Sequence, residues 1–304
     1  MRPVANRPAA VLAVVVTVAV TAMIGIVLST SRGGAPSSSA TVVETAEKHA
    51  VQPNYVAIGS SFAAGPGDGP IVDRGCLRTG DNYPSQVAEQ LGLKLIDVTC
   101  SGSTAAELVT GPKDRRSQRR PQIEAVDADT ELVTITTGGN DIDFVGRLIT
   151  EACTNLVALG LLPSCGSGRL PPAAPTTADY ARLEASLVSA VKAIKARAPR
   201  ADVVIVDYTP VVSMNAPMCP MLPLAPWNVV QDAQIADEMS AVNQRVADRT
   251  GADHVVTTGL ADEHSVCGPE PWARGFGKGM AFHPNASGKA GIADLVVESV
   301  RGES

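Results

Sequence analysis

The chain of 304 residues is long enough for one or two domains, and 45% of its residues are apolar, which is ample for a buried core. Its 25 lysines and arginines stand against 31 aspartates and glutamates, a net charge of -6. The high apolar content excludes a disordered chain. The negative balance gives no general attraction to nucleic acid or anionic lipid, so we expect no nucleic-acid partner.

The N-terminus predicts a membrane or signal segment. Arg2 and Arg7 precede an uncharged apolar run over residues 9–28, and Arg32 follows it. Such a run is long enough to span a bilayer, whereas a secretory signal usually has a shorter apolar region and a small-x-small cleavage site. We favour an uncleaved signal-anchor at residues 1–30 over a cleaved signal. Both export the rest of the chain, either anchored in the cell membrane and facing outward or secreted.

A linker rich in serine, alanine and glycine is expected at residues 31–50, followed by one folded domain at residues 51–304. Short apolar runs rich in β-branched residues are typical of parallel strands covered on both faces, and they occur at residues 55–58, 94–98, 132–136, 203–206 and 254–257. Apolar residues recur at steps of three and four, as in amphipathic helices, through residues 180–194, through residues 235–246 and from Asn285 onward. The alternation of strands and helices along the chain predicts an α/β fold with a parallel sheet and right-handed crossovers.

Six cysteines follow the apolar segment, at positions 76, 100, 153, 165, 219 and 267. An even number in an exported protein suggests three disulfides, for which sequence alone permits 15 connectivities. The short separation of Cys153 and Cys165 makes local pairing the simplest choice there. Zinc is not expected, because no C-x-x-C or H-x-x-x-H pair occurs.

Two long loops are expected, at residues 157–176 and 208–227. Long loops on such a sheet tend to form the binding site. The second is apolar, with Met214, Met218 and Trp227 among its residues. It either lines an acyl pocket or packs beneath a disulfide through Cys219, and the two roles are compatible.

A serine lies on the turn after the first predicted strand, in the sequence GSSFAAG at residues 59–65. A hydroxyl there projects from the carboxyl edge of the sheet, where ligands usually bind, and its small neighbours leave room for a substrate carbonyl. Ser61 is therefore a candidate nucleophile. The competing interpretation is an ordinary Gly/Ser loop.

Other strand ends carry groups that a serine nucleophile needs. Gly102 follows the second predicted strand, where its N–H can face a ligand without a Cβ in the way, and Asn140 follows the third and has an amide to donate. Asn140 is otherwise a turn or cap residue. His283 precedes the last helix and is a candidate general base. Of the four histidines, His264 is its one serious competitor, since His49 and His254 fit structural or solvated roles.

The chain resembles the SGNH hydrolase superfamily, also called GDSL esterases and lipases, in four blocks in the family's order: Gly59-Ser60-Ser61, Ser101-Gly102, Gly139-Asn140-Asp141 and Phe282-His283-Pro284-Asn285. The resemblance implies a three-layer α/β/α sandwich with a mainly parallel five-stranded sheet, of flavodoxin-like type. It also implies Ser61 as nucleophile and His283 as base. The N–H groups of Ser61 and Gly102 and the Asn140 side chain would form an oxyanion hole. The α/β-hydrolase fold is the rival, but its G-x-S-x-G elbow would need glycine where Ala63 stands.

Two positions depart from the family pattern: Ser60 stands where aspartate usually precedes the nucleophile, and Met280 stands where an aspartate often supports the histidine. The chain is most similar to exported actinobacterial-type members with a Ser-His dyad and three disulfides paired in sequence order. That similarity implies the Met280 carbonyl as the group that orients His283. The alternative is a carboxylate from the preceding loop. The candidates for this carboxylate are Asp262, Glu263 and Glu270. The disulfide pairs that the similarity implies are Cys76–Cys100, Cys153–Cys165 and Cys219–Cys267.

The predicted function is an exported serine esterase or lipase that needs no metal and no cofactor. We expect a monomer acting on acyl lipids or an acylated envelope component. Carbohydrate O-acetyl esters and transfer to another alcohol use the same machinery. A hypothesis from another class is a catalytically silent envelope-binding module, suggested by Ser60 and Met280.

Overall fold

The computed structural model describes residues 53–113, 119–166, 168, 170–277 and 279–302. Five strands form one parallel sheet in the order β4-β1-β5-β6-β7, and β2 and β3 form a separate antiparallel pair. The strands are β1 (Asn54–Gly59), β2 (Ile71–Asp73), β3 (Arg78–Thr79), β4 (Lys94–Asp97), β5 (Thr130–Thr136), β6 (Asp202–Val206) and β7 (Asp253–Val255). The predicted five-stranded parallel sheet is confirmed, although its last strand ends at Val255, before Thr257.

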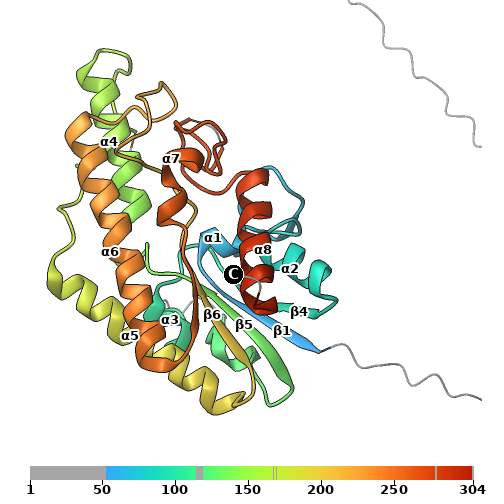
Figure 1. Cartoon of the computed structure of the whole chain (residues 1–304). Coiled ribbons are helices and arrows are strands. Elements are labelled where there is room, and N and C mark those ends of the chain that lie inside the picture. The colour runs from blue at the N-terminus through green and yellow to red at the C-terminus, as the bar shows by residue number, and fades with distance from the viewer. Residues whose placement is uncertain (1–52, 114–118, 167, 169, 278, 303–304) are drawn as a thin grey trace, which may run out of the picture. The chain divides into compact units, whose positions relative to one another are not determined.

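Helices cover both faces of the sheet (Figure 1). α2 (Tyr83–Leu91) and α8 (Ala286–Arg301) pack together on one face, and α3 (Ala105–Thr110), α5 (Thr177–Arg197) and α6 (Pro226–Thr250) lie on the other. The remaining helices are α1 (Ser61–Ala64), α4 (Phe144–Ala158), α7 (Ala261–His264) and the 3₁₀ turns η1 (Gln122–Ala125) and η2 (Thr258–Leu260). The fold is therefore the three-layer α/β/α sandwich.

The central strand β1 shows why these strands read as unbroken apolar runs. Tyr55 and Ala57 pack with α2 and α8, whereas Val56 and Ile58 point to the opposite face and pack with α3 and α5. Successive side chains of a strand alternate between faces, so a strand buried on both faces needs apolar residues at every position. All four side chains are fully buried.

The structure contains three disulfides: Cys76–Cys100, Cys153–Cys165 and Cys219–Cys267. This is the pairing that the family resemblance implies, and disulfides of this kind indicate export to an oxidising compartment. Within the described ranges, no helix has the length and apolar character needed to cross a bilayer. The signal-anchor at residues 1–30 and the linker at residues 31–50 lie outside the described residues.

Candidate active site

Ser61 begins α1, directly beyond the end of β1. The turn is tight because β1 lies close against β5: a Cβ added to Gly59, whose φ is 149°, would come within 2.3 Å of the Thr136 carbonyl oxygen. The Ser60 N–H donates to that same oxygen at 2.9 Å. Gly65 closes the helix in the left-handed conformation, at φ 66°. Glycine at both ends therefore lets the chain turn sharply and present Ser61 at the carboxyl edge of the sheet.

The structure brings Ser61 and His283 together from opposite ends of the domain. Their Oγ and Nε2 atoms are 2.8 Å apart, and the two side chains are buried, with 7% and 5% of their surface exposed. His283 is held by its backbone, since its carbonyl accepts from the Arg274 N–H at 2.9 Å. Asn285 caps α8 through its side chain, which accepts from the Gly288 N–H at 2.9 Å. The histidine thus stands on a short segment fixed on both sides.

The prediction that the Met280 carbonyl orients His283 is wrong. Nδ1 of His283 lies 2.9 Å from the carbonyl oxygen of Ala281 instead. The Met280 carbonyl is occupied in a turn, where it accepts the backbone N–H of His283 at 3.2 Å. Phe282 takes a left-handed φ of 62° in that turn, and this rotation directs the Ala281 carbonyl toward the ring. The principle of a main-chain acceptor holds, but the residue differs.

No carboxylate from the preceding loop supports His283 among the described residues. Asp262 accepts instead from Ser213 Oγ at 2.5 Å and from the Asn215 amide. Glu270 is used through its backbone, where its carbonyl contacts His264 Nδ1 at 2.8 Å. The ring nitrogens of His283 therefore face one hydroxyl and one carbonyl. Because a carbonyl can only accept, the proton of the neutral ring lies on Nδ1 and Nε2 is free to accept from Ser61.

Burial lowers the pKa of His283, because a charged imidazolium loses hydration in this site, and the positive Arg274 nearby lowers the pKa further. The hydrogen bond to the Ala281 carbonyl raises the pKa but does not reverse the net direction. The imidazole is therefore neutral over a wider pH range than a free histidine. A neutral imidazole is the form that can remove a proton.

Gly102 and Asn140 reach the same edge of the sheet as Ser61. Cys100, next to the glycine block, donates its N–H to the Gly59 carbonyl at 3.0 Å, and Asn140 Nδ2 donates to the Ser103 carbonyl at 2.9 Å. One amide proton of Asn140 is thereby used to hold the side chain, and the other is left to donate. Across the described residues, nothing accepts from the backbone N–H of Ser61 or of Gly102. These groups are donors without internal partners, as an oxyanion hole requires.

The backbone conformation gives a further reason for glycine at position 102. A Cβ there would meet no protein atom within 4 Å, so packing within the protein does not require glycine. The φ of Gly102 is 85°, a conformation that side chains with a Cβ rarely adopt. This conformation by itself favours glycine at the turn.

Two supporting residues were not foreseen from the sequence. Gln122 lies on η1, and its side chain accepts from the Gly59 N–H at 2.7 Å and donates to the Gly59 carbonyl at 3.0 Å. Tyr208 follows β6, and its hydroxyl lies 2.8 Å from Ser60 Oγ and accepts from the Gly139 N–H at 3.1 Å. No sequence signal marks either residue, because each acts across a long stretch of chain. Ser60 is thus part of a hydrogen-bond network at the position where the family usually has aspartate.

The other histidines in the described region have structural partners. His254 Nε2 lies 2.8 Å from the buried carboxylate of Asp207. His264 stacks on Trp272 with ring centroids 4.1 Å apart. His49 lies outside the described residues. The geometry therefore favours His283 over His264 as the candidate general base.

The chain matches the GDSL-like lipase/acylhydrolase family over residues 57–290. It is 32% identical to Lipase 2 of Streptomyces coelicolor, over 81% of this chain and 85% of that protein. Among solved structures, the extracellular lipase of Streptomyces rimosus has a TM-score of 0.61 at 25% identity, covering 82% of this chain and 99% of that one. Phospholipase A1 of Streptomyces albidoflavus has a TM-score of 0.62 at 23% identity, with the same coverage, and shares the fold.

Proposed function

The chain belongs to the GDSL-like lipase/acylhydrolase family and is a carboxylic ester hydrolase, and we propose that Ser61 and His283 perform its catalysis as a dyad. The observation that carries this proposal is the continuous line of contacts from Ser61 Oγ through the His283 ring to the Ala281 carbonyl, at 2.8 and 2.9 Å. The carbonyl fixes the ring orientation and tautomer, which is the first task of a triad carboxylate.

In the proposed acylation step, His283 Nε2 removes the proton of Ser61 Oγ as that oxygen attacks the ester carbonyl carbon. The carbonyl oxygen becomes negatively charged, and the N–H groups of Ser61 and Gly102 and the amide of Asn140 stabilise it. The bond to the alcohol oxygen then breaks. His283 gives its proton to that oxygen, so the alcohol leaves as a neutral molecule and the acyl group stays on Ser61.

Deacylation repeats the sequence with water as the nucleophile. His283 removes a proton from the water, whose oxygen attacks the acyl carbon, and then returns that proton to Ser61 Oγ as the acid is released. An alcohol in place of water would give transfer by the same steps. Every proton in this cycle passes through Nε2.

For the substrate we propose an acyl lipid or another apolar ester. Support comes from the similarity to Lipase 2 of Streptomyces coelicolor and from the apolar loop after β6, in which Val211 and Val212 belong to the same buried cluster as Phe62. Carbohydrate O-acetyl esters are the second class to be tested.

We further propose that residues 9–28 anchor the enzyme at the outer face of the cell membrane, or direct its secretion if they are cleaved.

A fluorophosphonate probe tests the proposed dyad. We expect wild-type enzyme to be labelled and Ser61→Ala to be unlabelled while keeping its fold. His283→Ala should lower turnover by about 100 to 10,000-fold, as expected for a lost general base. His264→Ala is the matched control, since it removes a buried imidazole elsewhere and should keep turnover near wild type. A folded wild type that is neither labelled nor active on short, long or acetylated-sugar esters would instead support a silent binding module.

A further inference from the structure

The main chain of Arg274 is paired with the segment that carries the proposed base. Its backbone N–H donates to the His283 carbonyl at 2.9 Å, and its carbonyl accepts from the Phe282 N–H at 3.0 Å. The neighbouring residues Ala273 and Pro284 form an antiparallel bridge. Arg274 is 8% exposed, so its side chain is held inside the protein beside His283.

The guanidinium of Arg274 joins this segment to the one that carries the proposed nucleophile. Nη1 donates to the Pro284 carbonyl at 2.6 Å and to the Pro66 carbonyl at 3.3 Å, and both bonds are buried. Pro284 directly follows His283 in the chain. One nitrogen atom thus bonds a residue on the base side and a residue on the nucleophile side, from opposite ends of the domain sequence.

The connection from Pro66 to Ser61 is short and stiff. The Gly65 N–H donates to the Ser61 carbonyl at 2.9 Å, which closes one helical turn between them. Pro66 follows that turn, and its ring fixes its own φ. A displacement of Pro66 is therefore passed to Ser61 across a single turn of helix.

Gly67 shows how closely the guanidinium packs against this segment. The φ of Gly67 is 147°, and a Cβ added there would come within 2.3 Å of Arg274 Nη1 and 2.4 Å of Cζ. A side chain at position 67 would therefore displace the guanidinium. Glycine is needed here because the arginine approaches the backbone so closely.

The ion pair of Arg274 matters less than its carbonyl contacts. Nη2 lies 2.9 Å from Asp68 Oδ2, but the Asp68 side chain is 90% exposed. An ion pair with so exposed a partner contributes little in water. The bonds to Pro66 and Pro284 are buried, so their loss leaves two carbonyls without a partner.

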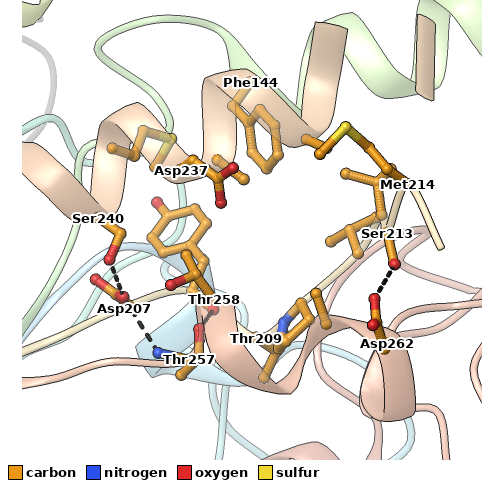
Figure 2. Close-up of a pocket in the computed structure, with 18 of the residues that line it drawn as sticks. Phe144, Asp207, Thr209, Ser213, Met214, Asp237, Ser240, Thr257, Thr258 and Asp262 are labelled. Atoms are coloured by element: carbon orange, nitrogen blue, oxygen red, sulfur yellow. Dashed lines mark hydrogen bonds between the residues drawn. The ribbon is translucent and has the colours of Figure 1, made fainter. Parts of the chain in front are cut away.

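The aromatic residues beside the dyad lead to a separate cavity. The Phe62 ring lies 5.2 Å from the His283 ring and stacks on Tyr208 at 3.8 Å, measured between ring centroids. Tyr208 lines a cavity of about 170 Å³ beyond the carboxyl ends of β6 and β7 (Figure 2). Ser61, His283 and Arg274 do not line it. Arg274 therefore acts on the dyad from within the protein framework, and not through this cavity.

We propose that Arg274 is a positioning residue for the proposed dyad. Its guanidinium holds the Pro66 and Pro284 carbonyls together, and thereby keeps the two atoms of the dyad at the distance that proton transfer requires. The dyad side chains bond each other and the Ala281 carbonyl, so Arg274 acts on them through the main chain. A misplacement of about 1 Å can cost about 100-fold in rate. This inference rests on the proposed dyad.

Steady-state kinetics with the neutral ester p-nitrophenyl butyrate test this role. Arg274→Met keeps an apolar stem but donates no hydrogen bond, and it should lower kcat by about 10- to 100-fold with KM within about twofold of wild type. Arg274→Lys keeps the charge without the planar guanidinium, and it should lower kcat by about three- to tenfold. Gly67→Ala keeps Arg274 but displaces its guanidinium, and it should lower kcat by about tenfold.

Two control variants should keep kcat within about twofold of wild type. Asp68→Asn removes the exposed ion pair of Arg274 and leaves both carbonyl contacts in place. Arg245→Met removes an arginine whose carboxylate partners, Glu184 and Glu238, lie on α5 and α6. Thermal melts of every variant establish that it is folded under the assay conditions.

The pKa of His283 gives a readout that a loss of stability alone does not change. The positive charge of Arg274 lowers this pKa, so Arg274→Met should raise it and move the acid limb of kcat/KM to higher pH. Arg274→Lys retains the charge, so its acid limb should stay near that of wild type although kcat falls. An NMR titration of the His283 ring in the Ser61→Ala background measures the same pKa without turnover.

A folded Arg274→Met variant with the wild-type kcat would overturn the proposal. A raised KM with an unchanged kcat would also overturn it, because Arg274 would then bind substrate. If Arg274→Met does not fold, wild-type kcat in both Arg274→Lys and Gly67→Ala overturns it.

The dyad is tested separately by Ser61→Ala and His283→Ala. If these two variants keep turnover, the proposed function is wrong. If they lose turnover and the folded Arg274 variants do not, only the positioning role is wrong.

Discussion

The side-chain amide of Gln122 makes hydrogen bonds with both backbone polar groups of Gly59, accepting from the N–H at 2.7 Å and donating to the carbonyl at 3.0 Å. The same Nε2 lies 3.1 Å from Ser103 Oγ, in the residue whose carbonyl holds the Asn140 side chain. Gln122 thereby links the turn before Ser61 to the residues of the proposed oxyanion hole. Gln122 is 7% exposed, so water does not readily replace these bonds.

Gln122→Leu should lower kcat by about tenfold with little change in KM, because the variant leaves the turn before Ser61 without its side-chain support. It should also cost about 1 to 3 kcal/mol of folding stability, since Gly59 loses a buried partner. Steady-state kinetics and denaturant unfolding measure the two effects. Gln90→Leu is the control, because Gln90 is exposed and bonds Asp294 far from the site. If the Gln122→Leu variant has reduced stability but keeps the wild-type kcat, Gln122 has a structural role only.

Tyr208→Phe keeps the ring that stacks on Phe62 and removes only the hydroxyl. Gly139 and Ser60 then lose a buried partner, and Asn140 is the next residue along the chain. We expect kcat to fall several-fold and stability to fall by about 1 to 3 kcal/mol. Tyr180→Phe removes a hydroxyl that has no hydrogen bond among the described residues and should leave kcat unchanged. A loss of equal size in both variants would contradict the role given to the Tyr208 hydroxyl.

The pH dependence of kcat/KM should follow the neutral form of His283. Because burial lowers the pKa of His283, the base form persists to lower pH, and the acid limb should have its midpoint below 6.5. Asp141 is the competing group, since burial raises its pKa to about 6. Asp141→Asn should therefore leave the acid limb in place. A limb that disappears in this variant would assign it to Asp141.

Glu151 lies in a buried cluster with Arg147 and Asp232, and its carboxyl contacts the Arg147 guanidinium. Burial and the neighbouring carboxyl of Asp232 raise the pKa of Glu151 to about 8. A carboxyl whose folded pKa is raised favours folding most below its unfolded pKa of about 4.5 and loses that contribution as pH rises toward 8. Wild type should therefore lose stability relative to Glu151→Gln between pH 5 and 8, by more than about 1 kcal/mol. Unfolding curves at several pH values measure this.

The control for that series is Glu89→Gln, on the exposed side of α2, which makes the same charge change outside the cluster. Its stability difference from wild type should stay nearly constant over the same pH range. If the stability difference between Glu151→Gln and wild type is also independent of pH, Glu151 is ionised over this whole pH range. The burial of Glu151 with Asp232 would then have no effect on the pH dependence of folding.

The sequence by itself determined the five strands of the sheet, three of the helices that cover it (α5, α6 and α8) and the edge of the sheet where the proposed site forms. Buried strands such as residues 55–58 are unmistakable because both faces need apolar residues. Parallel strands also bring their carboxyl ends to one edge, so Ser61, Gly102 and Asn140 were predicted to lie close together before any contact was known. The pattern around His283 placed a base near them.

Only the tertiary structure decided how these groups are held. Gln122 reaches Gly59 across 63 residues and Tyr208 reaches Ser60 across 148, and no local pattern encodes such contacts. The choice of Ala281 over Met280 depends on the left-handed φ of Phe282 and on which carbonyl the turn leaves free. Local propensities fix secondary structure, whereas the direction of a single carbonyl is set by packing from the rest of the chain.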